Sequence, residues 1–119
     1  MVIVGRLKDV VVRGGENIGT KEIEELLFSH ESIIDVAIVG VPDDLMGERA
    51  CAIVVSRNPE LTLADITTHL GMSRIAKQKY PELLLLLPEL PRTVSGKIQK
   101  FQLREQALRA IELGDVQRR

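Results

Sequence analysis

The 119-residue chain is 45% hydrophobic and 28% charged, with a formal net charge of -1 and a pI near 6.1, which is typical of one globular domain and not of a nucleic-acid-binding segment. Aromatic residues make up 3% of the chain, so it offers few stacking surfaces for single-stranded nucleic acid. The single cysteine, Cys51, excludes a disulfide framework and a cysteine metal cluster, and its apolar neighbours predict a small buried side chain.

The hydropathy pattern predicts no membrane span. The longest apolar run, Leu83 to Leu87, is too short to cross a bilayer. The first residues, Met1 to Gly5, lack the charged-then-apolar order of a signal peptide. We therefore expect a protein of the reducing cytoplasm, and the charge balance predicts no nucleic-acid partner.

The first part of the chain predicts a β-hairpin and then a helix. The β-branched run Val10 to Val12 and the extended residue Ile18 flank Gly14-Gly15, a pair with the chemistry of a hairpin tip. Thr20 is expected to be the N-cap of the helix. The positions i, i+3, i+4 and i+7 are Ile23, Leu26, Leu27 and His30, which is helical spacing. His30, at the end of the helix, is expected to be a capping or half-buried histidine.

Two strands and a second helix are predicted next. Residues 33–41 and 48–55 are apolar segments separated by turn residues, so they are expected to pair as antiparallel strands. The second helix is expected to begin with a capping box, in which Thr62 caps the helix and Asp65 reaches back.

The last third of the chain predicts a strand, a loop and a helix. The run Leu83 to Leu87 lies between two prolines and has the length of a buried strand. Apolar spacing from Phe101 to Ile111 predicts an amphipathic C-terminal helix. The tail from Gly114 to Arg119 is expected to be frayed.

The order of these elements is hairpin, helix, strand, strand, helix, strand, helix. Because strands and helices do not alternate regularly, the chain is expected to adopt an α+β fold. This fold would have a small mixed sheet that includes the N-terminal hairpin, with about three helices packed on it. Residues 1–119 are expected to form a single domain.

The stretch from Pro91 to Ile98, here named the lysine loop, carries the clearest sign of chemistry. Its hydroxyl residues suit a tight turn, and Gly96 removes the Cβ beside Lys97 so that a ligand can come close. Lys97 is then a point charge that can bind an anion. The loop does not match the phosphate-cradling G-x-x-x-x-G-K-[ST] pattern, since Pro91 and Ile98 replace its first and last residues. A lysine that reaches an anion alone and a solvated surface lysine both remain open.

Three stretches together resemble a known family. They are Gly5 to Ile18 with the following Glu22-Ile23-Glu24, Val41 to Glu48, and the lysine loop with Lys100. In this order and spacing they are similar to the C-terminal domain of acyl-adenylate-forming enzymes, the AMP-dependent synthetases and ligases. That family includes acyl-CoA synthetases, peptide-synthetase adenylation domains and firefly luciferase. The resemblance covers the chain from about Gly5 to Glu105.

The resemblance implies a reaction and a domain organisation. Such enzymes make an acyl-AMP from a carboxylic acid and ATP, and then transfer the acyl group to a thiol such as that of CoA. A large N-terminal domain holds ATP and the acid, and the small C-terminal domain is a mobile lid. This chain would be that lid within a two-domain ligase, inactive alone, with the N-terminal domain outside these 119 residues. Magnesium is expected in the full-length enzyme with ligands outside this chain, and no metal site is predicted within it.

The resemblance also implies roles for individual residues. Lys97 matches the catalytic, ATP-contacting lysine of the adenylation step, and Arg6 matches an arginine that contacts the nucleotide. Lys8 falls on the hinge position about which the small domain swings, where some relatives have Asp. The turn Gly14-Gly15-Glu16 matches the loop that lines the path of the CoA thiol arm after rotation.

Two other functions remain open. One is a ligase that loads an aryl or amino acid onto a carrier protein, and the other is a non-catalytic α+β binding module in which Lys97 is dispensable. The loop Arg13 to Asn17 and the strand Gly47 to Ala52 look closer to ligases of medium-chain, alicyclic or aromatic acids than to acetate enzymes. Fatty acid metabolism is the expected setting.

Overall fold

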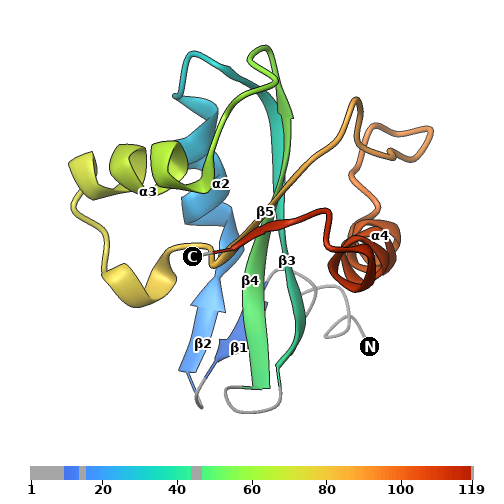
Figure 1. The fold of residues 1–119 in the computed structure, drawn as a ribbon, viewed down its shortest axis with the longest axis horizontal. Coiled ribbons are helices and arrows are strands. Elements are labelled where there is room, and N and C mark those ends of the chain that lie inside the picture. Colours follow the sequence, from blue (N-terminus) through green and yellow to red (C-terminus); the bar gives the residue numbers. More distant parts are fainter. Residues whose placement is uncertain (1–9, 14–15, 44–46, 119) are drawn as a thin grey trace.

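The structure is a computed structural model that describes residues 10–13, 16–43 and 47–118 (Figure 1). Within these ranges the chain forms three α-helices, one short 3-10 helix and a sheet of six strands. In chain order the elements are β1 (Val10–Arg13), β2 (Glu16–Gly19), α2 (Thr20–Phe28), β3 (Ile33–Asp43), β4 (Gly47–Ser56), α3 (Leu63–Met72), η1 (Lys77–Lys79), β5 (Leu83–Leu86), α4 (Lys100–Leu113) and β6 (Gln117–Arg118).

Strand β4 is the centre of the sheet. Along most of its length it pairs antiparallel with β3, as the two apolar segments predict. On its other side it pairs parallel with β5 over residues 51–54, and its first residue, Gly47, pairs antiparallel with Arg13 of β1. The sheet is therefore mixed and includes the β1–β2 hairpin, which confirms the predicted α+β class.

Helices cover both faces of this sheet. Figure 1 shows α2 and α3 on one side of the strands and α4 on the other. Alternate residues of each central strand enter two separate cores, so that Val36 and Ile38 pack toward α2 and α3 while Ala37 and Val39 pack toward α4. Burial on both faces explains why these strands appear in the sequence as continuous apolar runs.

The predicted capping box at the start of α3 is confirmed. Thr62 Oγ1 accepts a hydrogen bond from the Asp65 N–H at 3.2 Å, and Asp65 Oδ2 accepts one from the Thr62 N–H at 2.9 Å. The backbone N–H of Thr62 holds the pKa of the Asp65 carboxyl below its ordinary value, with help from the Thr62 side chain.

The predicted cap at the start of α2 is wrong by one residue. Gly19 occupies the N-cap position, and Thr20 is the first residue of the helix. Thr20 is buried, and its hydroxyl accepts a hydrogen bond from Lys100 Nζ at 3.0 Å. A tertiary contact therefore takes the oxygen that the local rule assigns to the helix N–H groups.

The prediction of a frayed C-terminal tail is wrong for its described part. Gly114 ends α4 in the left-handed conformation, with φ of 76°, and turns the chain back so that β6 pairs antiparallel with β5. The side-chain amide of Gln117 accepts a hydrogen bond from the Leu63 N–H at 2.9 Å and donates one to the Leu61 carbonyl at 3.0 Å. The tail thereby joins the sheet to the start of α3.

No helix in the described part of the chain combines the length and the apolar character needed to cross a bilayer.

Candidate functional site

The lysine loop is a tight hairpin. Its base is a β-bridge between Arg92 and Ile98. Above the base, the Thr93 N–H donates to the Lys97 carbonyl at 2.8 Å, and the Gly96 N–H donates to the Thr93 carbonyl at 2.9 Å. Gly96 has a φ of 91°, a left-handed conformation that glycine adopts without steric cost. This pattern is a three-residue hairpin loop that ends in a left-handed glycine.

Side-chain hydrogen bonds hold the same turn from within. Thr93 Oγ1 accepts from the Lys97 N–H at 3.2 Å and lies 2.9 Å from Ser95 Oγ. The Gln99 N–H donates to the Pro91 carbonyl at 3.0 Å and closes the base of the loop before α4 begins. The predicted turn chemistry of the hydroxyl residues is thereby confirmed, and the backbone at Lys97 is fixed from both sides.

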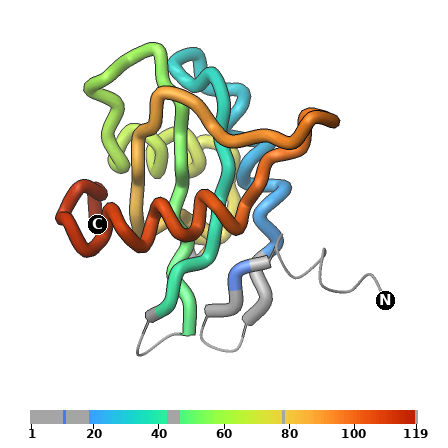
Figure 2. The backbone as a smooth tube through the Cα atoms, turned by 90° about the vertical axis from the view of Figure 1, so that its right-hand side faces the viewer, coloured from blue at the N-terminus to red at the C-terminus, as the bar shows by residue number. Residues whose placement is uncertain are grey.

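The side chain of Lys97 is exposed. None of the residues that the structure describes forms a salt bridge or a hydrogen bond with its ammonium group. Val94, at the tip of the hairpin, is also fully exposed, with a relative exposure of 109%. The loop, drawn in orange, projects from the body of the domain in both views (Figures 1 and 2). The ammonium of Lys97 therefore lies on the surface of the described domain.

Lys100, three residues beyond Lys97, has the opposite environment. Its ammonium lies 2.8 Å from Glu24 Oε2, and the two side chains are only 13% and 16% exposed. The same Glu24 oxygen accepts a hydrogen bond from the Ile38 N–H at 2.8 Å. The first turn of α4 is thus tied to α2 and β3, which places the lysine loop at a fixed point of the fold.

The other predicted site residues fall mostly outside the described ranges. Arg6, Lys8, Gly14 and Gly15 lie there, and of Glu16 only the backbone, the first residue of β2, is described. The ends of β1 and β2 lie at the bottom of Figure 1, whereas the lysine loop lies near the top. The described ends of β1 and β2 therefore lie apart from the lysine loop.

Two histidines pack between α2 and α3. The rings of His30 and His69 lie edge to face with centroids 5.0 Å apart. His30 Nδ1 accepts a hydrogen bond from the Ser32 N–H at 3.0 Å, which confirms the prediction of a half-buried histidine at the helix end. His69 Nε2 lies 2.9 Å from the Leu26 carbonyl. Among the described residues no group of three or more His, Cys, Asp or Glu side chains could hold a metal ion.

Cys51 lies inside the core on the α4 side of the sheet, with no exposed surface. Burial raises the pKa of its thiol to about 12. Since the thiolate is the reactive form, this cysteine is a packing residue, as its sequence neighbours predict.

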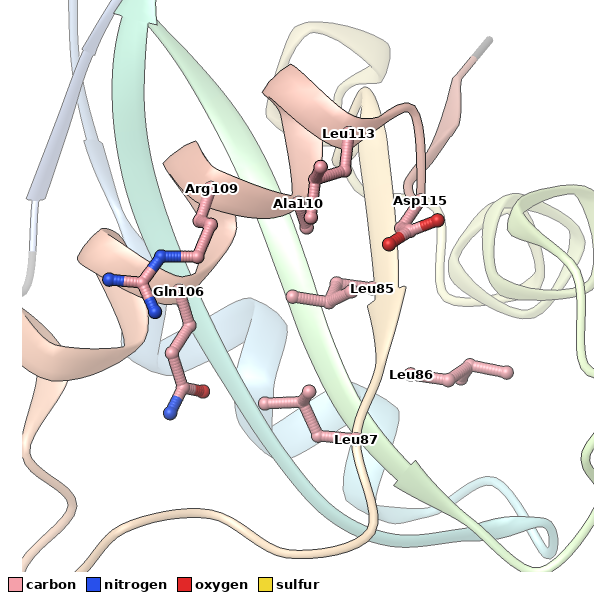
Figure 3. A pocket seen from close by; sticks show the side chains of 8 residues that line it. All are labelled: Leu85, Leu86, Leu87, Gln106, Arg109, Ala110, Leu113 and Asp115. Carbon is pink, nitrogen blue, oxygen red and sulfur yellow. The ribbon is translucent and has the colours of Figure 1, made fainter.

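A pocket of about 390 Å³ lies between β5 and the C-terminal half of α4 (Figure 3). Leu85 and Leu87 point toward α4, and Leu86 points to the opposite side of the sheet, as strand alternation requires. Arg109 and Asp115 contribute charged groups to the lining. Lys97, the predicted site residue whose side chain lies within the described part of the chain, does not line this pocket.

Two further residues at the lysine loop were not predicted as site residues. Arg92 Nη1 donates to the Gly96 carbonyl at 2.8 Å, and its Nη2 forms an ion pair with Asp35 of β3. The sequence signal for Asp35 was a lone carboxylate within an otherwise apolar strand. Such a residue is seldom buried without a partner.

The sequence of this chain is similar to a known protein family and to several longer proteins. Residues 22–97 match the family described as AMP-binding enzyme C-terminal domain. A medium-chain fatty-acid–CoA ligase of Escherichia coli strain K12 is 46% identical over 111 residues, which are 92% of this chain and 20% of that enzyme. The pseudomonine synthase PmsE of Pseudomonas entomophila is 44% identical over 102 residues, which are 86% of this chain and 17% of that protein.

A solved structure agrees in fold. The apo structure of MbtA from Mycobacterium smegmatis superposes with a TM-score of 0.79 and 41% sequence identity. The match covers 83% of this chain and 19% of that one. This chain therefore spans about a fifth of the length of the proteins it matches.

Proposed function

This chain belongs to the family of AMP-binding enzyme C-terminal domains, and from that membership we propose that it is the small, mobile domain of a larger two-domain ligase. The ligase activates a carboxylic acid with ATP and transfers the acyl group to the thiol of CoA. A larger N-terminal domain binds ATP and the acid, and this chain closes over them. The support for this division is that a medium-chain fatty-acid–CoA ligase contains the matching segment as 20% of its length.

The observation that carries the proposal is the exposed ammonium of Lys97 on a hairpin whose backbone is fixed by hydrogen bonds. In the first half-reaction a carboxylate oxygen attacks the α-phosphorus of ATP, and the bond from phosphorus to the pyrophosphate oxygen breaks. Two anions approach each other and charge builds on the phosphoryl oxygens. A single ammonium between them stabilises that transition state.

The second half-reaction uses a different part of the domain. The thiol of CoA loses its proton, its sulfur attacks the acyl carbon, and AMP leaves with the electrons of the acyl–oxygen bond. We assign Gly14, Gly15 and Glu16 to the path of the thiol arm, Lys8 to the hinge and Arg6 to the nucleotide. The wide separation of β1–β2 from the lysine loop supports a rotation between the two steps (Figure 1).

Magnesium is proposed to have its ligands outside this chain. We place it with the phosphates of ATP in the larger domain. ATP and CoA are then substrates that this chain contacts and does not bind alone. The cytoplasm, where both substrates are available, is the proposed location, with fatty acid metabolism as the setting.

Substitution of Lys97 in the full-length ligase tests the proposal. ATP–pyrophosphate exchange is measured with octanoate or benzoate, whichever the unaltered enzyme accepts. Lys97→Ala should reduce exchange by at least about 100-fold, because one preorganised charge at the phosphoryl oxygens is lost. Lys77→Ala removes another exposed lysine, on η1, and should leave exchange unchanged. Full exchange in Lys97→Ala would support the alternative of a non-catalytic binding module.

A carrier protein is the alternative acceptor, which stays open because the chain is also 44% identical to a protein named as a synthase and not as a CoA ligase. The acid would then be an aryl or amino acid. Supplying the enzyme with CoA and, separately, with a phosphopantetheine-bearing carrier protein separates the two proposals. Thioester on CoA alone favours the CoA ligase, and thioester on the carrier protein alone overturns it.

A further inference from the structure

A guanidinium group links the lysine loop to the sheet. Arg92 Nη1 donates to the carbonyl of Gly96, the residue before Lys97, at 2.8 Å. Its Nη2 forms an ion pair with the Asp35 carboxylate on β3. One planar side chain therefore spans from the backbone beside Lys97 to a strand 57 residues earlier in the sequence.

The carboxylate of Asp35 is held in place by an irregularity of β3. Ile33 pairs with Ser56 and Asp35 with Val55, so that Ile34 is an extra residue between them and is half exposed. Such bulges redirect the following side chain. Asp35 Oδ1 also accepts a hydrogen bond from the Val36 N–H at 3.0 Å, and the side chain is only 16% exposed. Arg92 thus meets a partner with a fixed position.

The internal hydrogen bonds of the lysine loop fix its shape but not its direction relative to the sheet. Two apolar residues near the base, Leu90 and Ile98, pack into the core on the α4 side. Apolar contacts are non-directional. Charge-assisted hydrogen bonds from a guanidinium group are directional, so the Arg92–Asp35 pair adds a directional restraint between the hairpin and the sheet.

We propose that Arg92 and Asp35 are positioning residues that aim the ammonium of Lys97 at the reacting phosphoryl group during adenylation. This inference rests on the proposed function of Lys97. Neither residue is proposed to touch the substrate. Arg92 acts through the carbonyl of Gly96, and Asp35 acts through Arg92. The effect is therefore confined to the half-reaction that uses Lys97.

The test compares both half-reactions in the full-length ligase. Arg92→Ala and Asp35→Asn should each reduce ATP–pyrophosphate exchange with octanoate or benzoate by about 10- to 100-fold, the usual cost of a misplaced catalytic group. The fall should lie in kcat and not in the KM for ATP. Thioester formation from supplied acyl-AMP and CoA should be unchanged. The double variant should lose no more than the worse single variant, because both changes break one link.

A matched control is available on α4. Arg104 pairs with Glu48 at 3.4 Å and is as exposed as Arg92, at 47% against 42%, but it is not hydrogen-bonded to the lysine loop. Arg104→Ala should keep exchange near the unaltered level. Compared with Arg92→Ala, Arg92→Lys keeps the positive charge but not the planar guanidinium group. It should therefore recover only part of the exchange that Arg92→Ala loses.

The outcomes separate the inference from the proposed function. If Lys97→Ala abolishes exchange and Arg92→Ala does not reduce it, the inference fails while the function of Lys97 stands. An equal fall of both half-reactions in Arg92→Ala, or a similar loss in Arg104→Ala, also overturns it, because the effect would then be on folding. If Lys97→Ala itself keeps exchange, the proposed function fails first.

Discussion

At the scale of single residues, Gly96 determines the backbone conformation from which Lys97 emerges. Its φ of 91° lies in the left-handed region, where a side chain is strained. An added Cβ would meet no heavy atom within 4 Å. The cost of replacing this glycine is therefore conformational and not steric.

Gly96→Ala should lower the free energy of unfolding by about 1–2 kcal/mol, the cost of a left-handed alanine. It should also reduce ATP–pyrophosphate exchange in the full-length ligase, because the hairpin relaxes away from its present geometry. Gly114→Ala is the matched control, since Gly114 has a φ of 76° and equally open surroundings at the far end of α4. It should cost similar stability and leave exchange intact. Equal loss of exchange in both variants would contradict the prediction.

Residue-scale predictions from the sequence succeeded where the cause was local. The tight turn of the lysine loop follows from its hydroxyl residues and its glycine, and the capping box at Thr62 follows from a three-residue spacing. Thr20 was misassigned because its hydroxyl is taken by Lys100, 80 residues away. The partner of Asp35 was equally hidden, since a bulge and a loop far along the chain create it.

At the scale of elements, the start of α4 is held by a half-buried polar cluster. Lys100 contacts Glu24 and Thr20 of α2, and Glu24 in turn accepts from the backbone of Ile38 in β3. Breaking a well-buried ion pair costs several kcal/mol, because an uncompensated charge is left behind. This cluster is partly exposed, so a smaller cost applies.

Lys100→Met should lower the free energy of unfolding of this chain by about 2 kcal/mol, measured by chemical denaturation. The double variant Glu24→Gln with Lys100→Met should recover about half of that loss, since the glutamine oxygen still accepts from the Ile38 N–H and no charge is stranded. Lys79→Met, at an exposed pair with Glu22 whose atoms lie 3.5 Å apart, should cost less than about 0.5 kcal/mol. Equal losses in the free energy of unfolding at the two ion pairs would show that burial does not determine the cost of breaking them.

Element types were predictable because apolar spacing is a local property. The run Leu83 to Leu87 and the segments at 33–41 and 48–55 proved to be strands, and the helix predicted from Phe101 became α4. The strand β6 was missed because two residues carry no periodicity. Its pairing depends on Gly114 and on the two hydrogen bonds of Gln117.

At the scale of the whole molecule, the proposed function has this chain supply one charged group to a reaction whose other participants are held elsewhere. The described residues contain no cluster that could hold a metal ion, and the pocket between β5 and α4 lies away from the lysine loop. The proteins it matches are about five times as long. Its contribution to catalysis is thus expected only in the company of a larger domain.

The isolated 119-residue chain should show no ATP–pyrophosphate exchange with any of octanoate, benzoate or acetate. The physical reason is that Lys97 alone cannot hold ATP and an acid within reacting distance. Circular dichroism and a cooperative thermal transition should show that the chain is folded under the same conditions. Exchange above background in the isolated, folded chain would refute the proposed division of labour.

The α+β class and the lysine loop could be predicted from the sequence, whereas the assignment of faces could not. Apolar runs such as Val36 to Val39 show that a strand is buried but not which helix covers each side. The placement of α4 opposite α2 and α3 depends on contacts between segments remote in sequence. The roles of Arg6, Lys8, Gly14, Gly15 and Glu16 stay predictions.

Because helices cover both broad faces of the described sheet, a neighbouring domain would meet strand ends, connecting loops and outward helix surfaces in place of the sheet faces (Figure 1). A domain with such a closed interior can carry separate functional segments on its surface. The proposed rotation would therefore exchange one surface segment for another without repacking the core side chains. Substitutions in these surface segments can therefore change the reactivity of the enzyme while the folding of the domain stays the same.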